Sequence, residues 1–202
     1  MRQPQQIPKR SIREAGDVRT WSDWLFQHQP VEKLYGLGES MGASILLQSL
    51  AIEPRFRAVV AECSFVTFEQ IAFDRLSQVT GLPAPTFWPI VKLGFLYARF
   101  RYGVDLRRAS PAAAIHRTRV PILLIHGVLD DNILIRHSRE LCAANRGIVR
   151  LWEVPGAGHA GALSVAPAAY IKTVTEWFRT GGADDRFSSS AYFTCEAGHK
   201  NR

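Results

Sequence analysis

The chain has 202 residues, of which 47% are hydrophobic and 21% charged, a composition typical of one ordinary globular domain with its own core. The formal net charge is +7, but four of the positive charges lie in the amino-terminal segment, at Arg2, Lys9, Arg10 and Arg13. No basic helix and no alternation of aromatic and basic residues occurs in the sequence, which argues against a nucleic-acid partner. The first dozen residues are polar and form no signal peptide, which favours a cytoplasmic protein.

The first predicted strand, residues 31–37, leads directly into a serine. One helix precedes this strand, and the Gly-x-Ser-x-Gly motif around Ser40 joins it to an apolar helix predicted over residues 41–50. A serine on so sharp a turn between a strand and a helix is typical of a nucleophile elbow. Gly38 and Gly42 have no side chains, and so tight a turn has no room for side chains at these positions. The alternative is a glycine-rich turn with an idle serine.

Two later strands each end beside a residue that could assist Ser40. Residues 120–127 form a continuous apolar run, which is typical of a strand buried on both faces, and Asp130 follows it. Residues 149–154 form another strand, which ends in a loop of small residues around His159 and is followed by a helix. A nucleophilic serine needs a base and an acid that orients the base. Sites of this kind collect where parallel strands end.

The orienting acid has a second candidate, Asp131. This residue could equally be the N-cap of a helix predicted over residues 133–144, because Asp is favoured at that position. We expect His126, in the pair His126-Gly127 at the end of a strand, to be structural. Three other histidines lie in surface-like helical or loop contexts: His28, His116 and His137.

More than fifty residues separate the strand that ends near Cys63 from the one that begins near Val120, which is more than a single connecting helix requires. The most apolar part, residues 87–97, is too short to cross a membrane, and Pro89 and Lys92 interrupt it. It could form the core face of a connecting helix or a cap that lines an acyl pocket over the serine. We favour a cap insertion over residues 65–116.

The three cysteines suggest neither a metal site nor a disulfide framework, because they are odd in number and lack Cys-x-x-Cys spacing. Cys63 is expected to be a packed thiol. The carboxyl-terminal tail, residues 181–202, is rich in Gly, Ser and small polar residues, and we expect it to be disordered, with Cys195 and His199 idle. No metal and no organic cofactor is expected.

Three blocks of this sequence, residues 36–43, 121–130 and 154–159, resemble the α/β-hydrolase superfamily, and they are most similar to its serine aminopeptidase and dipeptidyl-peptidase-like esterase branch. The resemblance covers residues 14–180 and leaves residues 1–13 as a polar amino-terminal segment. It implies a partial α/β-hydrolase fold, with a mostly parallel sheet flanked by helices. It also implies a serine hydrolase that acts on a small-molecule acyl compound or a peptide. From the charge pattern and the lack of a long apolar segment, we expect neither nucleic acid nor a membrane as partner. The implied site comprises Ser40 as nucleophile, Asp130 as orienting acid, His159 as base and the backbone N–H of Met41 as an oxyanion donor.

The amino end departs from the family pattern. Such hydrolases have an earlier strand followed by a His-Gly loop that gives a second oxyanion N–H, and no His-Gly pair precedes Ser40 here. We therefore expect the carboxyl-terminal part of the fold, with residues 34–37 as an exposed sheet edge through which the chain could self-associate. The alternative to an active enzyme is a non-catalytic remnant, or a fragment that needs a complementing chain.

Overall fold

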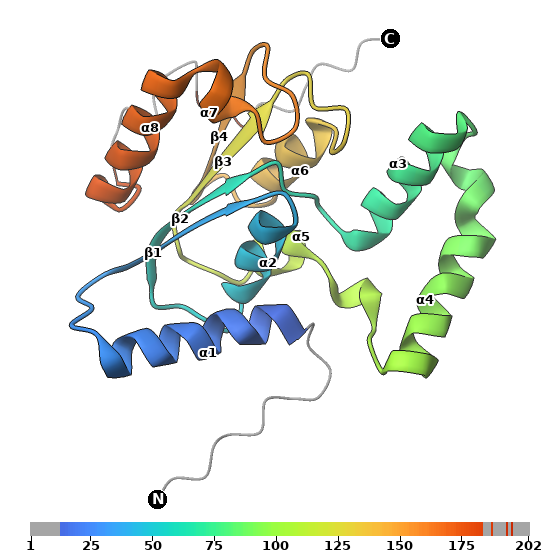
Figure 1. Cartoon of the computed structure of the whole chain (residues 1–202), viewed down its shortest axis with the longest axis horizontal. Coiled ribbons are helices and arrows are strands. Elements are labelled where there is room, and N and C mark those ends of the chain that lie inside the picture. The colour runs from blue at the N-terminus through green and yellow to red at the C-terminus, as the bar shows by residue number, and fades with distance from the viewer. Residues whose placement is uncertain (1–12, 184–186, 188–192, 194, 196–202) are drawn as a thin grey trace, which may run out of the picture.

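The computed structural model of the chain describes residues 13–183, 187, 193 and 195 (Figure 1). At its centre is a sheet of four parallel strands, arranged in the order in which they occur along the chain. These strands are β1 (Leu34–Glu39), β2 (Phe56–Glu62), β3 (Ile122–Gly127) and β4 (Val149–Val154). Because all four are parallel, their carboxyl ends meet at one edge of the sheet. The sheet and its flanking helices confirm the predicted fold class.

Helices cover both faces of the sheet, because successive side chains of a strand point to opposite faces. On one face, Val59 and Leu124 pack among apolar side chains of four helices: α1 (Arg13–His28), α2 (Met41–Ser49), α5 (Pro111–Ile115) and α6 (Arg136–Ala144). On the other face, Val60 and Leu123 pack against α7 (Ala162–Val165) and α8 (Pro167–Thr180). Figure 1 shows α7 and α8 on the side of the sheet away from α1 and α2.

The strands differ in how far they are buried. Every residue of β3 is buried, as its continuous apolar run predicts. By contrast, β2 is the only strand that pairs with β1 among the described residues, and Leu37 is 49% exposed. The strand predicted over residues 31–37 lies slightly later in the chain and continues to Glu39, directly before Ser40. In the described part of the chain, β1 is therefore an edge strand.

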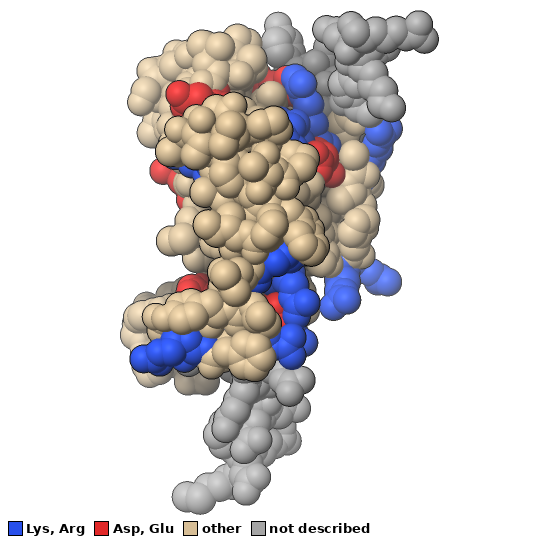
Figure 2. All heavy atoms as spheres, turned by 90° about the vertical axis from the view of Figure 1, so that its right-hand side faces the viewer, with Lys and Arg blue, Asp and Glu red and all other residues tan. Residues whose placement is uncertain are grey.

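The segment between β2 and β3 contains a helical pair that lies outside the two helical layers (Figure 1). The segment comprises α3 (Phe68–Thr80), η1 (Ala84–Phe87), α4 (Trp88–Tyr102) and η2 (Leu106–Arg108) before the chain returns at α5, and α3 and α4 are the pair. Val91 and Phe95 of α4 are buried, whereas most apolar side chains on its outer side are exposed: Ile90, Leu93, Leu96, Tyr97 and Phe100. Figure 2 faces this side of the molecule and shows a broad uncharged surface with basic side chains beside it. Only part of the apolar run is therefore buried, as the core face of a connecting helix would be.

No described helix is both long enough and apolar enough to cross a membrane. Pro89 lies in the first turn of α4, where its missing N–H disrupts no helical hydrogen bond. Lys92 forms an ion pair with Glu69 of α3 at 2.6 Å, which joins the two long helices of this segment.

Parts of the tail pack against the domain. Phe187 is buried with its ring perpendicular to that of Trp177, and Cys195 forms a disulfide with Cys142 of α6. The predictions that Cys195 is idle and that the cysteines form no disulfide are therefore wrong. The two cysteines are 53 positions apart, so no local spacing could indicate the pair. His199 and most of the predicted disordered tail lie outside the described residues.

Candidate active site

Ser40 occupies a strained turn between β1 and α2. Its backbone has φ 53° and ψ −117°, a positive φ that few non-glycine residues adopt. Its N–H donates to the carbonyl oxygen of Glu62 at 2.8 Å, and its own carbonyl accepts from the Ser44 N–H at 3.1 Å. The turn is therefore bound to β2 on one side and to the first turn of α2 on the other.

The two glycines of the motif are not equivalent. A Cβ atom on Gly38 would lie 2.8 Å from the backbone nitrogen of Ala43, which is too close for any side chain. A Cβ atom on Gly42 would meet nothing within 4 Å. The sequence predicts that the turn needs both glycines, but among the described residues only Gly38 is sterically required.

The structure brings Ser40, His159 and Asp130 together at the carboxyl edge of the sheet. Nε2 of His159 lies 2.9 Å from Oγ of Ser40, and Nδ1 of the same ring lies 2.9 Å from Oδ2 of Asp130. The three residues follow β1, β4 and β3, so parallel strands deliver them to one place. His159 is partly exposed, whereas the carboxyl group of Asp130 is fully buried. The imidazole can therefore be reached from outside, whereas the carboxyl group of Asp130 cannot.

The carboxyl group of Asp130 also holds its own loop. Oδ1 accepts hydrogen bonds from the backbone N–H groups of Asn132 and Ile133, both at 2.9 Å. Burial by itself raises the pKa of Asp130, but the bonds from Ile133, His159 and Cys63 outweigh it, so the pKa lies below its ordinary value. The group is thus a carboxylate at neutral pH.

Asp131 differs from Asp130 in its exposure. Its side chain is exposed, and α6 begins only at Arg136, with Ile135 at the N-cap position. The alternative that Asp131 caps this helix is therefore wrong, because the predicted helix begins too early.

The loops that carry Asp130 and His159 touch through their backbones. The N–H of Leu129 donates to the carbonyl of Ala157 at 2.9 Å. A Cβ atom on Gly127 would lie 2.3 Å from the carbonyl oxygen of Gly158. Glycine at position 127 therefore allows the two loops to approach closely enough for the acid to reach the imidazole.

Ser40 opens on a mostly apolar cavity of about 510 Å³. Phe68 and Ile71 of α3 form part of its wall, so the segment between β2 and β3 contributes to the cavity beside the serine. No residue of the apolar run 87–97 is among the described lining, so a cap formed by that run stays a prediction. Glu14 and Arg75 are the charged residues among the described lining. The other apolar lining residues are Met41, Ile45, Phe65, Ala72, Leu106, Ala109 and Ile133.

Residues 9–181 match the sequence model of the prolyl oligopeptidase family. The chain belongs to this family. The match confirms the predicted relationship to the peptidase-like branch of the α/β hydrolases, and a hydrolase of this class is the coarse functional assignment that it supports. An uncharacterized protein of Bacillus subtilis (strain 168), YqkD, is 32% identical over 142 residues, which cover 69% of this chain and 46% of that protein. The chain thus spans less than half the length of this curated relative.

Solved α/β hydrolases share the fold of this family member. The esterase Pf2001 of Pyrococcus furiosus superposes with a TM-score of 0.62 and 18% identity, over 82% of this chain and 60% of that one. A puromycin-hydrolyzing peptidase of Mycobacterium tuberculosis gives 0.61 and 14%, over 82% and 25%. At these identities the similarity establishes the fold alone, and the chain again corresponds to only part of each longer protein.

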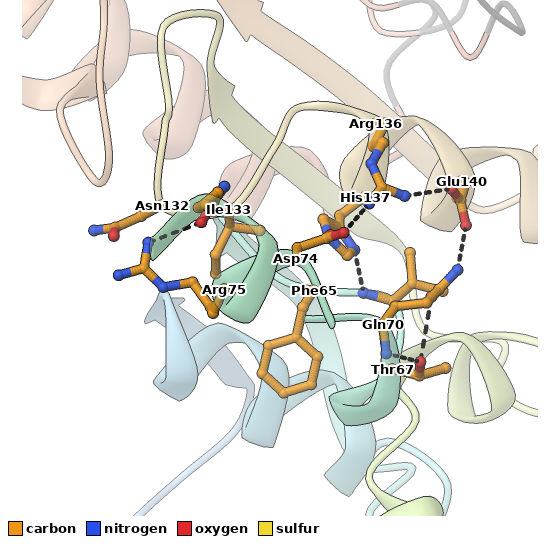
Figure 3. A network of polar contacts seen from close by, with 12 residues as sticks. Phe65, Thr67, Gln70, Asp74, Arg75, Asn132, Ile133, Arg136, His137 and Glu140 are labelled. Carbon is orange, nitrogen blue, oxygen red and sulfur yellow. Dashed lines mark hydrogen bonds and ion pairs between the residues drawn. The ribbon is translucent and has the colours of Figure 1, made fainter. Parts of the chain in front are cut away.

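A network of polar contacts, in which the side chains of Asp74 and His137 are buried, joins α3 of this family member to α6, the helix that follows Asp130 (Figure 3). Nε2 of His137 lies 2.7 Å from Oδ2 of Asp74 in α3, and Arg136 forms an ion pair with the same carboxylate. Gln70 donates to Glu140 of α6 at 3.1 Å. The prediction that His137 lies at the surface is wrong, because its side chain is fully buried. A lone histidine in a short helix gives no local sign of a partner so far away in the chain.

Cys63 lies beside Asp130 and His159. Its sulfur and ligand atoms of Asp130 and His159 lie within 4.8 Å of one another. Burial raises the pKa of Cys63 to about 12, so the thiol stays protonated at neutral pH. This protonation suits the packed thiol that the sequence predicts rather than a second nucleophile.

Proposed function

We propose that the protein is a serine hydrolase that cleaves an ester, amide or other acyl bond through an acyl-enzyme on Ser40. One observation carries this proposal: an unbroken path of contacts from Oγ of Ser40 through the ring of His159 to the buried carboxylate of Asp130. At its Ser40 end, this path opens on a cavity with room for a small ligand.

The geometry supports the following sequence of steps. Oγ of Ser40 attacks the carbonyl carbon of the substrate while Nε2 of His159 takes its proton, and Asp130 holds the Nδ1–H of the resulting imidazolium. The C–O or C–N bond to the leaving group then breaks, and His159 returns the proton to that group. Water attacks the acyl-enzyme in the same way, with His159 again as base, and releases the acid and the free serine.

The charge on the carbonyl oxygen would be stabilised at the start of α2. The backbone N–H of Met41 follows Ser40 at the amino end of this helix, where free N–H groups and the helix dipole favour negative charge. Met41 therefore remains our proposed oxyanion donor.

The substrate would be a small acyl compound or peptide with an apolar group in the cavity. Phe65, Phe68 and Ile71 provide apolar surface close to Ser40. Such surface binds alkyl or aromatic groups by excluding water from them.

A second candidate is a fragment that becomes active only with a complementing chain. Two observations favour it: the described sheet ends at β1, and the chain covers 60% of the length of the esterase Pf2001.

Labelling with a fluorophosphonate probe tests both candidates. If the proposed function holds, the probe labels the wild-type chain and fails to label Ser40→Ala, while His159→Ala is labelled far more slowly. Equal labelling of wild type and Ser40→Ala would contradict the assignment of the nucleophile. Absence of labelling in both would favour the second candidate.

A further inference from the structure

Glu62 has a buried carboxyl group that the proposed reaction does not use. It is the last residue of β2, and its side chain has no exposed surface. Oε1 accepts a hydrogen bond from the Ala162 N–H at 3.1 Å. Oε2 has no well-formed hydrogen bond among the described residues, although the Tyr170 hydroxyl lies beside the carboxyl group. An unpaired buried polar atom costs about 1–3 kcal/mol, so stability alone does not account for a glutamate here.

The backbone and the side chain of Glu62 each contact a segment that carries a residue of the proposed site. Its carbonyl oxygen accepts the Ser40 N–H at 2.8 Å and so holds the strained turn. Its side chain holds the N–H of Ala162, three positions after His159. One residue therefore links the turn that carries the serine to the loop that carries the imidazole.

The backbone on either side of these contacts is strained in a way that needs support. Cys63 has φ 53° and Ala160 has φ 49°, and both conformations are uncommon for residues other than glycine. The Ala160 N–H donates to the sulfur of Cys63 at 3.4 Å. Strained conformations persist only where their surroundings hold them. The contact from Glu62 to Ala162 closes the other side of the turn that contains Ala160.

The charge of Glu62 is not needed for this contact. Burial raises the pKa of the carboxyl group, against the hydrogen bond from Ala162 and the hydroxyl of Tyr170. Glu39 of β1 lies opposite Glu62 in register, and its negative charge also raises this pKa. Whether neutral or ionised, an oxygen atom remains to accept the Ala162 N–H, and a glutamine would offer the same acceptor.

We propose that Glu62 is a positioning residue that holds the loop of His159 against the turn of Ser40. In this role it keeps Nε2 of the imidazole within hydrogen-bond distance of Oγ. The inference rests on the proposed function for its effect on catalysis, but the geometric effect on His159 can be measured without turnover.

Three variants separate positioning from general destabilisation. Glu62→Ala removes the acceptor, Glu62→Gln keeps an acceptor without the charge, and Glu53→Ala removes another fully buried glutamate. Glu53 precedes β2 and binds Arg55, at the opposite edge of the sheet from the serine. We expect Glu62→Ala to slow fluorophosphonate labelling of Ser40 about 100-fold, the typical cost of a displacement of about 1 Å. Glu62→Gln should restore most of this rate, and Glu53→Ala should lower the melting temperature while leaving the labelling rate of the folded protein near that of the wild type.

With an ester substrate, Glu62→Ala should lower kcat and leave KM nearly unchanged, because Glu62 does not line the cavity. Equal rates for wild type and Glu62→Ala would overturn the proposal. So would a Glu62→Gln variant that loses as much activity as Glu62→Ala.

Nuclear magnetic resonance of the imidazole ring gives a readout that does not depend on activity. The signals of His159, assigned with His159→Gln, should shift in Glu62→Ala and stay in place in Glu62→Gln. Unchanged signals in Glu62→Ala would overturn the proposal. If the wild-type chain is not labelled at all, the proposed function fails, and this spectrum alone decides the role of Glu62.

Discussion

Asp74 and His137 lie 63 positions apart in the chain, yet Nε2 of His137 contacts Oδ2 of Asp74 at 2.7 Å. The Val66 N–H donates to Nδ1 of the same ring at 3.3 Å, so Nδ1 is an acceptor and the proton of the neutral ring lies on Nε2. The ring thus joins the residues that precede α3 and the middle of α3 to α6. This contact makes the attachment of α3 sensitive to protonation.

Acid should weaken the fold through His137. Burial lowers the pKa of this ring below its ordinary value of 6.5, and it outweighs Asp74 and Glu140, which raise the pKa. Below pH 6.5 the unfolded ring takes up a proton that the folded ring still excludes, so the free energy of unfolding falls as pH falls. The slope is at most about 1.4 kcal/mol per pH unit for one ring.

His137→Gln should therefore show a smaller loss of stability than the wild type when urea unfolding is compared at neutral pH and below pH 6.5. Buried His126, whose pKa burial also lowers, remains in both proteins and keeps the variant from being wholly insensitive to pH. Parallel pH profiles for the two proteins would show that His137 is not the group responsible.

The orienting acid can be identified by a pair of neighbouring substitutions. Asp130→Asn should lower the labelling of Ser40 and ester turnover by about 10⁴-fold, because the imidazole loses the acceptor that sets its tautomer. Asp131→Asn should leave both near wild type and change stability by no more than about 0.5 kcal/mol, since Asp131 is exposed and caps no helix. An inactive Asp131→Asn beside an active Asp130→Asn would reverse the assignment.

The glycines of the elbow should respond differently to alanine. Gly38→Ala places a Cβ atom 2.8 Å from backbone atoms of Gly42 and Ala43, so we expect loss of labelling at Ser40 together with a lower melting temperature. Gly42→Ala has open space and lies in α2, where alanine is favoured by about 1 kcal/mol over glycine. Thermal unfolding and probe labelling of the two variants test this, and equal damage from both would contradict the difference in space around the two glycines.

The disulfide between Cys142 and Cys195 should stabilise the domain. Such a bond is typically worth about 2–4 kcal/mol, mainly because it restricts the unfolded chain. Reductant should therefore lower the melting temperature of the wild type and leave that of Cys195→Ser unchanged. A thiol assay of the denatured, unreduced protein should find Cys63 alone reactive. Three reactive thiols would exclude the bond. A cytoplasmic location stays a prediction, and this bond would be unusual there.

The edge of the sheet should drive self-association. Leu37 on β1 and Trp21 on α1 are 49% and 65% exposed, and among the described residues no strand pairs with the outer side of β1. A free strand edge readily pairs with another chain. We expect size-exclusion chromatography with light scattering to show dimers or larger species for the wild type. Leu37→Lys should shift the chain toward the monomer, whereas Ile171→Lys, on the exposed face of α8, should not. A wild type that stays monomeric as its concentration rises would refute this.

The parts of the molecule that the sequence predicts are those carried by local patterns. Ser40, Asp130 and His159 each follow an apolar strand, and parallel strands deliver such residues to one edge. The choice of Asp130 over its neighbour needed the family pattern, because the start of α6 could not be located from residue types alone. The two glycines of the elbow look alike in sequence, and only the space available for a Cβ atom at each position distinguishes Gly38 from Gly42.

The features that escaped prediction depend on contacts between distant segments. Glu62 ends an apolar strand without any motif, and its partner Ala162 lies 100 positions later. His137 needs Asp74, and Cys195 needs Cys142, for its role to be visible. In each case the role of the side chain depends on a partner that is distant in the sequence and close only in the folded chain.

The five tryptophans divide into two optical classes. Trp21, Trp24 and Trp88 face solvent on α1 and α4, while Trp152 is buried and Trp177 donates its indole N–H to the carbonyl of Val59 inside the sheet. Emission from the first class is open to a dissolved quencher, and emission from the second is shielded. With the outer three replaced by phenylalanine, the remaining fluorescence would report on the docking of α8 against the sheet, without any dye attached to the protein.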